Sequence, residues 1–246
     1  YVIAFSLYFY YKSSGIYLLL LVGVSVSDFW IGRAIAHVSS RHAQRALVAL
    51  SIAADLAVLG YFKYTNFLGE TFASLTGGTF TAMDIFLPVG ISFFTFQSLS
   101  YTIDVYRRQI TPLTSLLDYA FYVSFFPQLV AGPIERATNL LPQFLRRRVF
   151  NYEDAVSGCR QVLWGFFKKV VIADNCASVV NVIFDSSSSD QSGSTLLLGA
   201  IFFTFQIYGD FSGYSDIAIG TGKLFGIRLM RNFNIPYFSR DIAEFW

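Results

Sequence analysis

Carboxylates within apolar stretches are the residues of this chain whose placement points most directly to chemistry. Asp210 and Asp216 lie in TLLLGAIFFTFQIYGDFSGYSDIAIGTG (195–222), and Asp174 lies in another apolar run. A charged side chain inside a membrane segment costs on the order of 2.5–3.5 kcal/mol on insertion scales, so it indicates a functional site by default. One hypothesis is that Asp210 and Asp216 orient polar groups around a channel. The alternative is that each carboxylate is a structural partner of an Arg or of backbone N–H groups.

A broken apolar run at residues 124–136, SFFPQLVAGPIER, is the second candidate region. A proline inside a helix removes a backbone donor and clashes one turn back, so a continuous spanning helix is excluded. Non-helical backbone at membrane depth is tolerated where protein or a water-filled cavity satisfies its polar groups. The segment is therefore predicted to line a site or path, or else to form a loop at the membrane interface. Its ionisable residues, Glu135 and Arg136, are site candidates or a simple interfacial pair.

The sequence lacks the residue patterns of a catalytic histidine site, a cysteine-based site, a phosphate loop or a metal centre. His37 and His42 lie in a basic loop far from the other polar clusters, so neither is predicted to be catalytic. Cys159 and Cys176 lack the spacing of a zinc site or a disulfide framework. There is no G-x-S-x-G elbow, glycine-rich phosphate loop or metal-ligand cluster in the sequence, so no bound metal is expected.

The composition is that of a membrane protein. Hydrophobic residues make up 54% of the chain and charged residues 14%, against about 25% charged in soluble domains. The net charge of +2 is too small and too dispersed for a nucleic-acid surface. Membrane lipid is thus the expected surroundings, and nucleic acid is excluded as a partner.

The apolar stretches predict an all-α polytopic protein with a single transmembrane domain over residues 1–246. Because the chain begins in an aromatic run and ends at Trp246 within an apparent element, we expect it to be incomplete at both ends. Lys168 and Lys169 are expected to snorkel to the interface. The predicted spans are 1–11, 16–31, 46–62, 84–105, 161–184 and 195–222, with a re-entrant segment at 116–133. The glycine pairs Gly209/Gly213 and Gly222/Gly226 are four residues apart and are predicted to allow close helix packing.

The distribution of basic residues predicts the orientation. Most of the 18 Lys and Arg residues fall on one side of the membrane if the loops at 32–45, 106–116, 134–160 and 223–240 share that side. By the positive-inside rule this side is cytoplasmic. The loops at 64–83 and 185–194 are then expected to lie outside.

Five motifs in matching order, from about Tyr61 to Trp246, resemble those of the membrane-bound O-acyltransferases. They are LPVGISFFTFQSLSYTIDVYR (87–107), SFFPQLVAGPIER (124–136), GFFKKVVIAD (165–174), FQIYGDFSGYSDIAIG (205–220) and NFNIPYFSRDIAEFW (232–246). Within that family the chain is similar to the bacterial branch that acetylates exported polysaccharide such as alginate. The resemblance implies a ring of transmembrane helices around a thin centre of short, tilted and re-entrant helices.

The resemblance also implies a reaction and its setting. Members of the family take an acyl group from a cytoplasmic donor, here acetyl-CoA, and pass it through the membrane to an acceptor. Their general base is a histidine, which this resemblance places in an Arg-Arg-Trp-His run just after Trp246. We therefore expect no catalytic residue within residues 1–246 and no activity from this piece alone. The implied setting is the bacterial inner membrane, with periplasmic acetyltransferase partners and an exopolysaccharide acceptor.

Matching to the family's motifs extends the set of site-lining candidates, although it assigns none of them a role. The set is Gln128, Glu135, Arg136, Asp210, Ser212, Tyr214, Asp216, Asn232 and Asn234.

Two alternative functions come from other classes. Secondary transporters also have broken helices and midplane carboxylates, but their two halves show corresponding interruptions. LPVGISFF and FPQLVAGPI share a Pro and a Gly without a wider repeat, which disfavours a transporter. A noncatalytic membrane scaffold would be favoured if the natural protein ended near Trp246.

Overall fold

A computed structural model describes residues 1–130, 132–133, 135–144, 146–185 and 191–245. These residues form helices and connecting segments, with no strand among them. Within the described ranges, three helical runs are long and apolar enough to cross a membrane: Val2–His37, Arg41–Thr76 and Gly193–Leu224. The prediction of an all-α membrane protein is confirmed.

The chain divides into two compact units, and the single transmembrane domain over residues 1–246 stays a prediction. The first comprises Tyr1–Val130 and Glu135–Leu145, and the second comprises Ala131–Ile134 and Arg146–Trp246. The ring of helices that the resemblance implies also stays a prediction.

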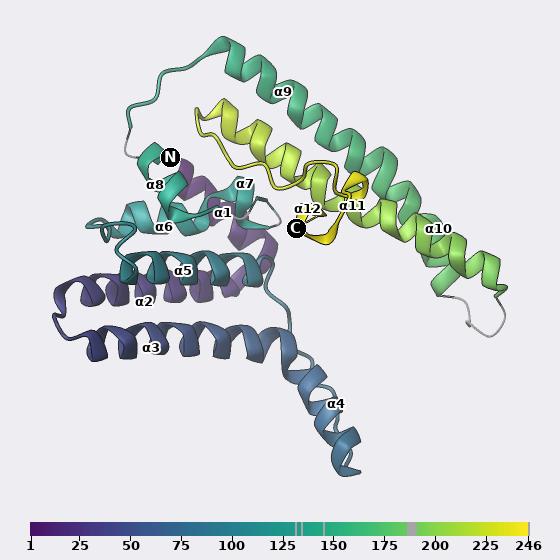
Figure 1. Ribbon diagram of the computed structural model, residues 1–246, viewed down its shortest axis with the longest axis horizontal. Coiled ribbons are helices and arrows are strands. Elements are labelled where there is room, and N and C mark those ends of the chain that lie inside the picture. Colours follow the sequence, from purple (N-terminus) through teal and green to yellow (C-terminus); the bar gives the residue numbers. More distant parts are fainter. Residues whose placement is uncertain (131, 134, 145, 186–190, 246) are drawn as a thin grey trace. The chain divides into compact units, whose positions relative to one another are not determined.

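Three helices of the first unit pack side by side (Figure 1): α2 (Leu18–His37), α3 (Arg41–Leu59) and α5 (Ile91–Tyr106). Their apolar faces bury large side chains such as Phe29 and Tyr101. α1 (Val2–Ser14) precedes them and contacts the short helices described below.

A polar seam runs through this apolar bundle. Asp28 on α2 is 1% exposed, and Asp55 on α3 is 2% exposed. Ser51, one turn before Asp55, donates a hydrogen bond of 2.8 Å from Oγ to Asp28 Oδ1. The predicted spans 16–31 and 46–62 contain these residues, so the structure adds a buried polar contact to two stretches that the sequence presents as ordinary apolar spans.

Two predicted boundaries in this unit are wrong. Residues 64–83, expected to be an external loop, include α4 (Thr65–Thr76), which ends at Gly77 with φ +71°. The span expected from residue 84 begins at Ile91, because Gly90 has φ +70° and ends the preceding non-helical segment. A Cβ at Gly90 would lie 2.1 Å from the Leu129 carbonyl oxygen, so this close backbone approach requires glycine.

The proline-containing segment is broken, as its sequence predicts. α6 (Leu116–Ser124) ends at Phe125, α7 (Phe126–Leu129) has a proline in its first turn, and α8 (Ala137–Phe144) follows. Backbone groups at the break find side-chain partners: the Tyr122 carbonyl accepts hydrogen bonds from Gln97 Nε2 at 2.6 Å and Gln128 Nε2 at 2.9 Å. Amide side chains thus replace the helical donors that the break removes.

The second unit is built on two long antiparallel helical runs (Figure 1). The first run is α9 (Tyr152–Phe166), a π-helical segment η3 (Phe167–Ala173) and α10 (Asp174–Phe184); the second is α11 (Gly193–Leu224). α9 starts nine residues before the predicted span at 161. The reason is a cap, since the Asn151 side chain accepts a hydrogen bond from the Asp154 N–H at 3.1 Å.

Glycines bring the two runs into backbone contact. A Cβ at Gly220 would lie 2.5 Å from the Gly158 carbonyl oxygen, and one at Gly165 would lie 2.6 Å from the Gly213 carbonyl oxygen. Small residues at these positions allow the helix axes to approach closely. Gly226, by contrast, lies beyond the end of α11 with φ +67°, so it serves a turn and not the predicted helix packing.

Candidate functional site

A pocket of about 330 Å³ lies within the second unit, between α9, η3, α11 and the segment at 231–233. On α11 its residues recur at helical spacing, from Tyr208 through Ser212 and Ser215 to Ile219, and therefore share one face. The lining residues are Gln161, Trp164, Lys168, Tyr208, Ser212, Ser215, Asp216, Ile219, Arg231, Asn232 and Phe233.

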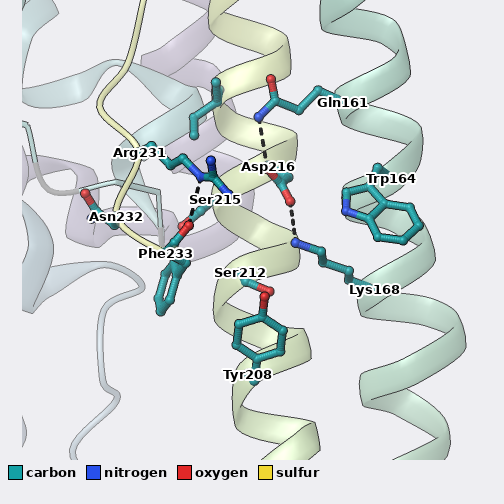
Figure 2. Close-up of a pocket in the computed structure, with 11 residues that line it drawn as sticks. Gln161, Trp164, Lys168, Tyr208, Ser212, Ser215, Asp216, Arg231, Asn232 and Phe233 are labelled. Atoms are coloured by element: carbon teal, nitrogen blue, oxygen red, sulfur yellow. Dashed lines mark hydrogen bonds and ion pairs between the residues drawn. The ribbon is translucent and has the colours of Figure 1, made fainter. Parts of the chain in front are cut away.

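An ion pair crosses the pocket between the two helical runs (Figure 2). Lys168 Nζ lies 2.7 Å from Asp216 Oδ2, and Gln161 Nε2 donates to Asp216 Oδ1 at 2.9 Å. The lysine and aspartate side chains are 13% and 19% exposed. Both carboxylate oxygens are therefore occupied in a largely water-excluded place, which fixes the direction of the ammonium group.

Two aromatic rings cover the same ammonium group. Lys168 Nζ lies 5.7 Å from the ring centroid of Trp164 and 5.7 Å from that of Tyr208. A cation over an aromatic face is attracted by the ring quadrupole, so the rings stabilise the charge without accepting a conventional hydrogen bond.

The next lysine, Lys169, contacts two carboxylates in more exposed surroundings. Lys169 Nζ lies 2.7 Å from Asp210 Oδ1 and 2.6 Å from Asp174 Oδ1, and its side chain is 39% exposed. Neither Lys169 nor Asp210 lines the pocket. Both lysines belong to the π-helical segment η3, a local irregularity often found at functional sites.

A buried hydroxyl group in the pocket, that of Ser212, lacks a hydrogen-bond partner among the described residues. Ser212 is 2% exposed, and its Oγ makes no hydrogen bond within the described part of the chain. Thr204, two turns earlier on α11, instead donates to the Ala200 carbonyl at 2.9 Å.

A larger cavity of about 1010 Å³ adjoins the pocket, sharing Tyr208, Arg231, Asn232 and Phe233 with it. The segment at 231–239 forms one wall and is anchored where Tyr237 Oη donates to the Thr204 carbonyl at 2.9 Å. Glu244 also lines it, and hydrogen bonds from the backbone N–H and then the side chain of Arg240 lower the pKa of that carboxyl.

The amino-acid sequence of the chain is similar to those of several known proteins. No family model matches the chain. It is 45% identical over 236 residues to the probable alginate O-acetylase AlgI of Pseudomonas aeruginosa, covering 94% of this chain and 45% of that protein. It is 37% identical over 267 residues to the peptidoglycan O-acetyltransferase of Helicobacter pylori, covering 98% of this chain and 50% of the relative. The matched region belongs to the membrane-bound O-acyltransferase family.

A more distant member has another acyl group in its name. The chain is 26% identical over 167 residues to the teichoic acid D-alanyltransferase of Bacillus subtilis, covering 64% of this chain and 40% of the relative. The chain spans about half the length of the curated O-acyltransferases that it matches.

The candidates drawn from the family's motifs fall into different parts of the chain. Ser212, Asp216 and Asn232 line the pocket, and Asn234 lines the adjoining cavity. Asp210 pairs with Lys169 outside the pocket, as described above. Tyr214 is half-buried and is absent from the lining of either cavity.

The remaining three candidates belong to the first unit. Gln128 is 2% exposed and supports the Tyr122 carbonyl, and Glu135 is 1% exposed and accepts a hydrogen bond from Asn139 Nδ2 at 2.7 Å. Arg136 is exposed. The Gln128 contact therefore supports the backbone of the broken segment, whereas the Glu135 contact joins two side chains.

Sequence reasoning did not select Lys168, Trp164 or Tyr208. The expectation that Lys168 snorkels to the interface is wrong, because the ammonium group is held at Asp216 in a largely buried place. Two lysines in one apolar run and two aspartates in the next already offered complementary charges, and that signal could have found the pair.

Proposed function

We propose that the full-length protein is a membrane O-acetyltransferase that passes acetyl groups from acetyl-CoA across the bacterial inner membrane to an exported polysaccharide. The observation that carries the proposal is 45% identity to a probable alginate O-acetylase along 94% of the chain. The pocket supports it by offering a small, polar, partly aromatic cavity beside the membrane-length helix α11.

The donor side follows from charge. α11 ends at Leu224, next to Lys223 in its last turn, and Arg228 and Arg231 come shortly after. By the positive-inside rule this end of the helix is cytoplasmic. Asp216 lies two turns from it, so the pocket is closer to the side on which acetyl-CoA is available.

The chemistry proposed is acyl transfer from a thioester to a hydroxyl. The C–S bond breaks, a C–O ester bond forms, the hydroxyl proton passes to a base, and the sulfur leaves with CoA. We assign the base to a histidine following Trp246, in line with the family resemblance. His37 and His42 are both exposed at the α2–α3 connection, where His37 Nδ1 lies 2.7 Å from the Arg33 carbonyl oxygen.

Partner proteins belong to the same proposal. Periplasmic acetyltransferases would receive the acetyl group and place it on the polysaccharide. Alginate, cellulose and peptidoglycan are the acceptor polymers to compare.

A genetic experiment tests the function. In a strain lacking the gene, the acetyl ester content of exported polysaccharide should fall to background and return with the full-length protein. Changing the first histidine after Trp246 to alanine should prevent that return, whereas His42→Ala should restore acetylation fully. Unchanged acetyl content in the deletion strain, for every polymer, would contradict the proposal.

A further inference from the structure

Among the described residues, the Lys168 ammonium and the Ser212 hydroxyl keep hydrogen-bond donors available in the pocket. We infer that the Lys168 ammonium and the Ser212 hydroxyl form a binding site for the carbonyl oxygen of the acyl group being transferred. The identity of the ligand rests on the proposed function, because acyl transfer is what would bring a thioester carbonyl here. The site itself rests on the contacts of Lys168, Ser212, Asp216 and Gln161.

Lys168 keeps donors available for a ligand. An ammonium group carries three N–H donors and no acceptor. One contact, at 2.7 Å, goes to Asp216 Oδ2, and within the described residues no second hydrogen-bond acceptor contacts Nζ. The rings of Trp164 and Tyr208 cover the cation at 5.7 Å without using these donors in conventional hydrogen bonds. An oxygen atom entering the pocket would find them open.

Ser212 supplies a second donor. Its residue is 2% exposed, it lines the same pocket, and its Oγ lacks a partner in the described part of the protein. Buried hydroxyl groups are generally hydrogen-bonded, because leaving one unpaired costs free energy. A bound carbonyl oxygen would provide the missing acceptor.

Asp216 and Gln161 hold the ammonium group in place. Gln161 Nε2 and Lys168 Nζ each occupy one oxygen of the Asp216 carboxylate, at 2.9 and 2.7 Å (Figure 2). Donors fixed before the ligand arrives stabilise developing negative charge on an oxygen without reorganisation. Lys168 is thus directed by its partners, and Asp216 acts as a positioning residue.

Charge favours a carbonyl over a phosphate as the group bound here. A phosphate would bring its negative charge next to the Asp216 carboxylate, and the two would repel in a poorly solvated place. A neutral carbonyl is polarised by the ammonium without that repulsion. Arg231, another cation in the lining, donates from Nε to the Phe233 carbonyl at 2.9 Å and has further N–H donors on its guanidinium group.

The test compares two probes that differ only in the acetyl group. The dissociation constants of acetyl-CoA and CoA are measured by calorimetry on the full-length protein in nanodiscs. Wild type should bind acetyl-CoA more tightly than CoA, and the ratio of the two dissociation constants measures this preference. Ser212→Ala should reduce the preference about threefold, as for the loss of one neutral hydrogen bond. Lys168→Met should reduce it about tenfold, as for the loss of one charged hydrogen bond. CoA affinity should stay unchanged in both variants. Lys169→Met is the matched control, because Lys169 pairs with Asp210 and Asp174 outside the pocket, and it should keep the full preference.

The outcomes separate the site from the function. Ser212→Ala removes a hydroxyl that has no hydrogen-bond partner among the described residues, so it should fold even if Lys168→Met does not. An undiminished preference in Ser212→Ala, or equal weakening of CoA and acetyl-CoA binding in Lys168→Met, would overturn the carbonyl site. Wild-type protein that neither acetylates polysaccharide nor binds acetyl-CoA would instead refute the proposed function.

Discussion

At the scale of single residues, Asp210 and Asp216 are two carboxylates on one helix that have different partners. Asp216 pairs with Lys168 inside the pocket, and Asp210 pairs with the more exposed Lys169 outside it. Six residues are one and two-thirds turns of helix, which directs the two side chains about 120° apart. The sequence predicted both aspartates as candidates, yet helical geometry alone excludes that they face the same direction.

Asp216→Asn is expected to destabilise the protein more than Asp210→Asn. The first change leaves the largely buried Lys168 ammonium without its counterion, which costs about 3–5 kcal/mol when such a pair is broken. The second removes one partner of Lys169, which keeps Asp174 and is 39% exposed, so the cost should be about 0–1 kcal/mol. Thermal unfolding of the two full-length variants in the same detergent measures the difference. A lower midpoint for Asp210→Asn than for Asp216→Asn would show that the pairing is assigned wrongly.

Other residue contacts were beyond prediction because they depend on tertiary packing. Asp28 sits within an apolar run and meets Ser51, which is 23 residues later in the chain. Tyr208 and Trp164 read as ordinary apolar residues of spanning helices, and only the fold brings both rings over Lys168. By contrast, the polar character of Ser212 and Asp216 on an apolar helix was visible in the sequence.

At the scale of elements, glycine contacts explain why α9 and η3 can lie directly against α11. Gly158 faces Gly220 and Gly165 faces Gly213, and Asp216 lies between these two contacts along α11. The close approach lets a lysine and an aspartate from different helices meet at 2.7 Å. Helix packing and the chemistry of the pocket therefore depend on the same small residues.

Gly220→Ala should force the helices apart. The added Cβ would lie 2.5 Å from the Gly158 carbonyl oxygen, a backbone atom that can move only with its helix. We expect a loss of stability of about 1–3 kcal/mol, as for overpacked cores, together with weaker acetylation. Gly193→Ala is the control on the same helix, since no atom of the described residues outside its own stretch of helix lies within 4 Å of its Cβ position. The midpoint of thermal unfolding checks both variants, and equal midpoints would contradict the packing described.

Apolarity predicted the presence of the long helices better than their ends. The helical run Gly193–Leu224 contains the predicted span 195–222, whereas Val2–His37 is one helical run where the sequence predicted two spans, 1–11 and 16–31. Their neighbours differ where a local feature decides: a side-chain cap starts α9 early, and a glycine with positive φ delays α5. The π-helical segment η3 had no sequence signal, since it follows from how its helix packs.

At the scale of the whole molecule, the charge content and the apolar helices predict a membrane protein and its orientation. The low charge content and the three membrane-length helical runs support a membrane protein. Identity of 45% to a probable alginate O-acetylase gives the family, which no pocket alone could have named. The placement of the cytoplasmic face rests on Lys and Arg in the connecting loops, so the direction of acetyl transfer is the claim that most needs a direct test.

Inverted inner-membrane vesicles carrying the full-length protein provide that test, because their cytoplasmic face is outside. Acetyl-CoA labelled in the acetyl group is added to the medium, and label in hydroxylamine-sensitive ester protected inside the vesicles is measured. We predict protected labelled ester that depends on the protein and is absent from right-side-out vesicles given the same donor. Equal label in vesicles with and without the protein, or label transferred only in right-side-out vesicles, would contradict acetyl transfer from a cytoplasmic donor.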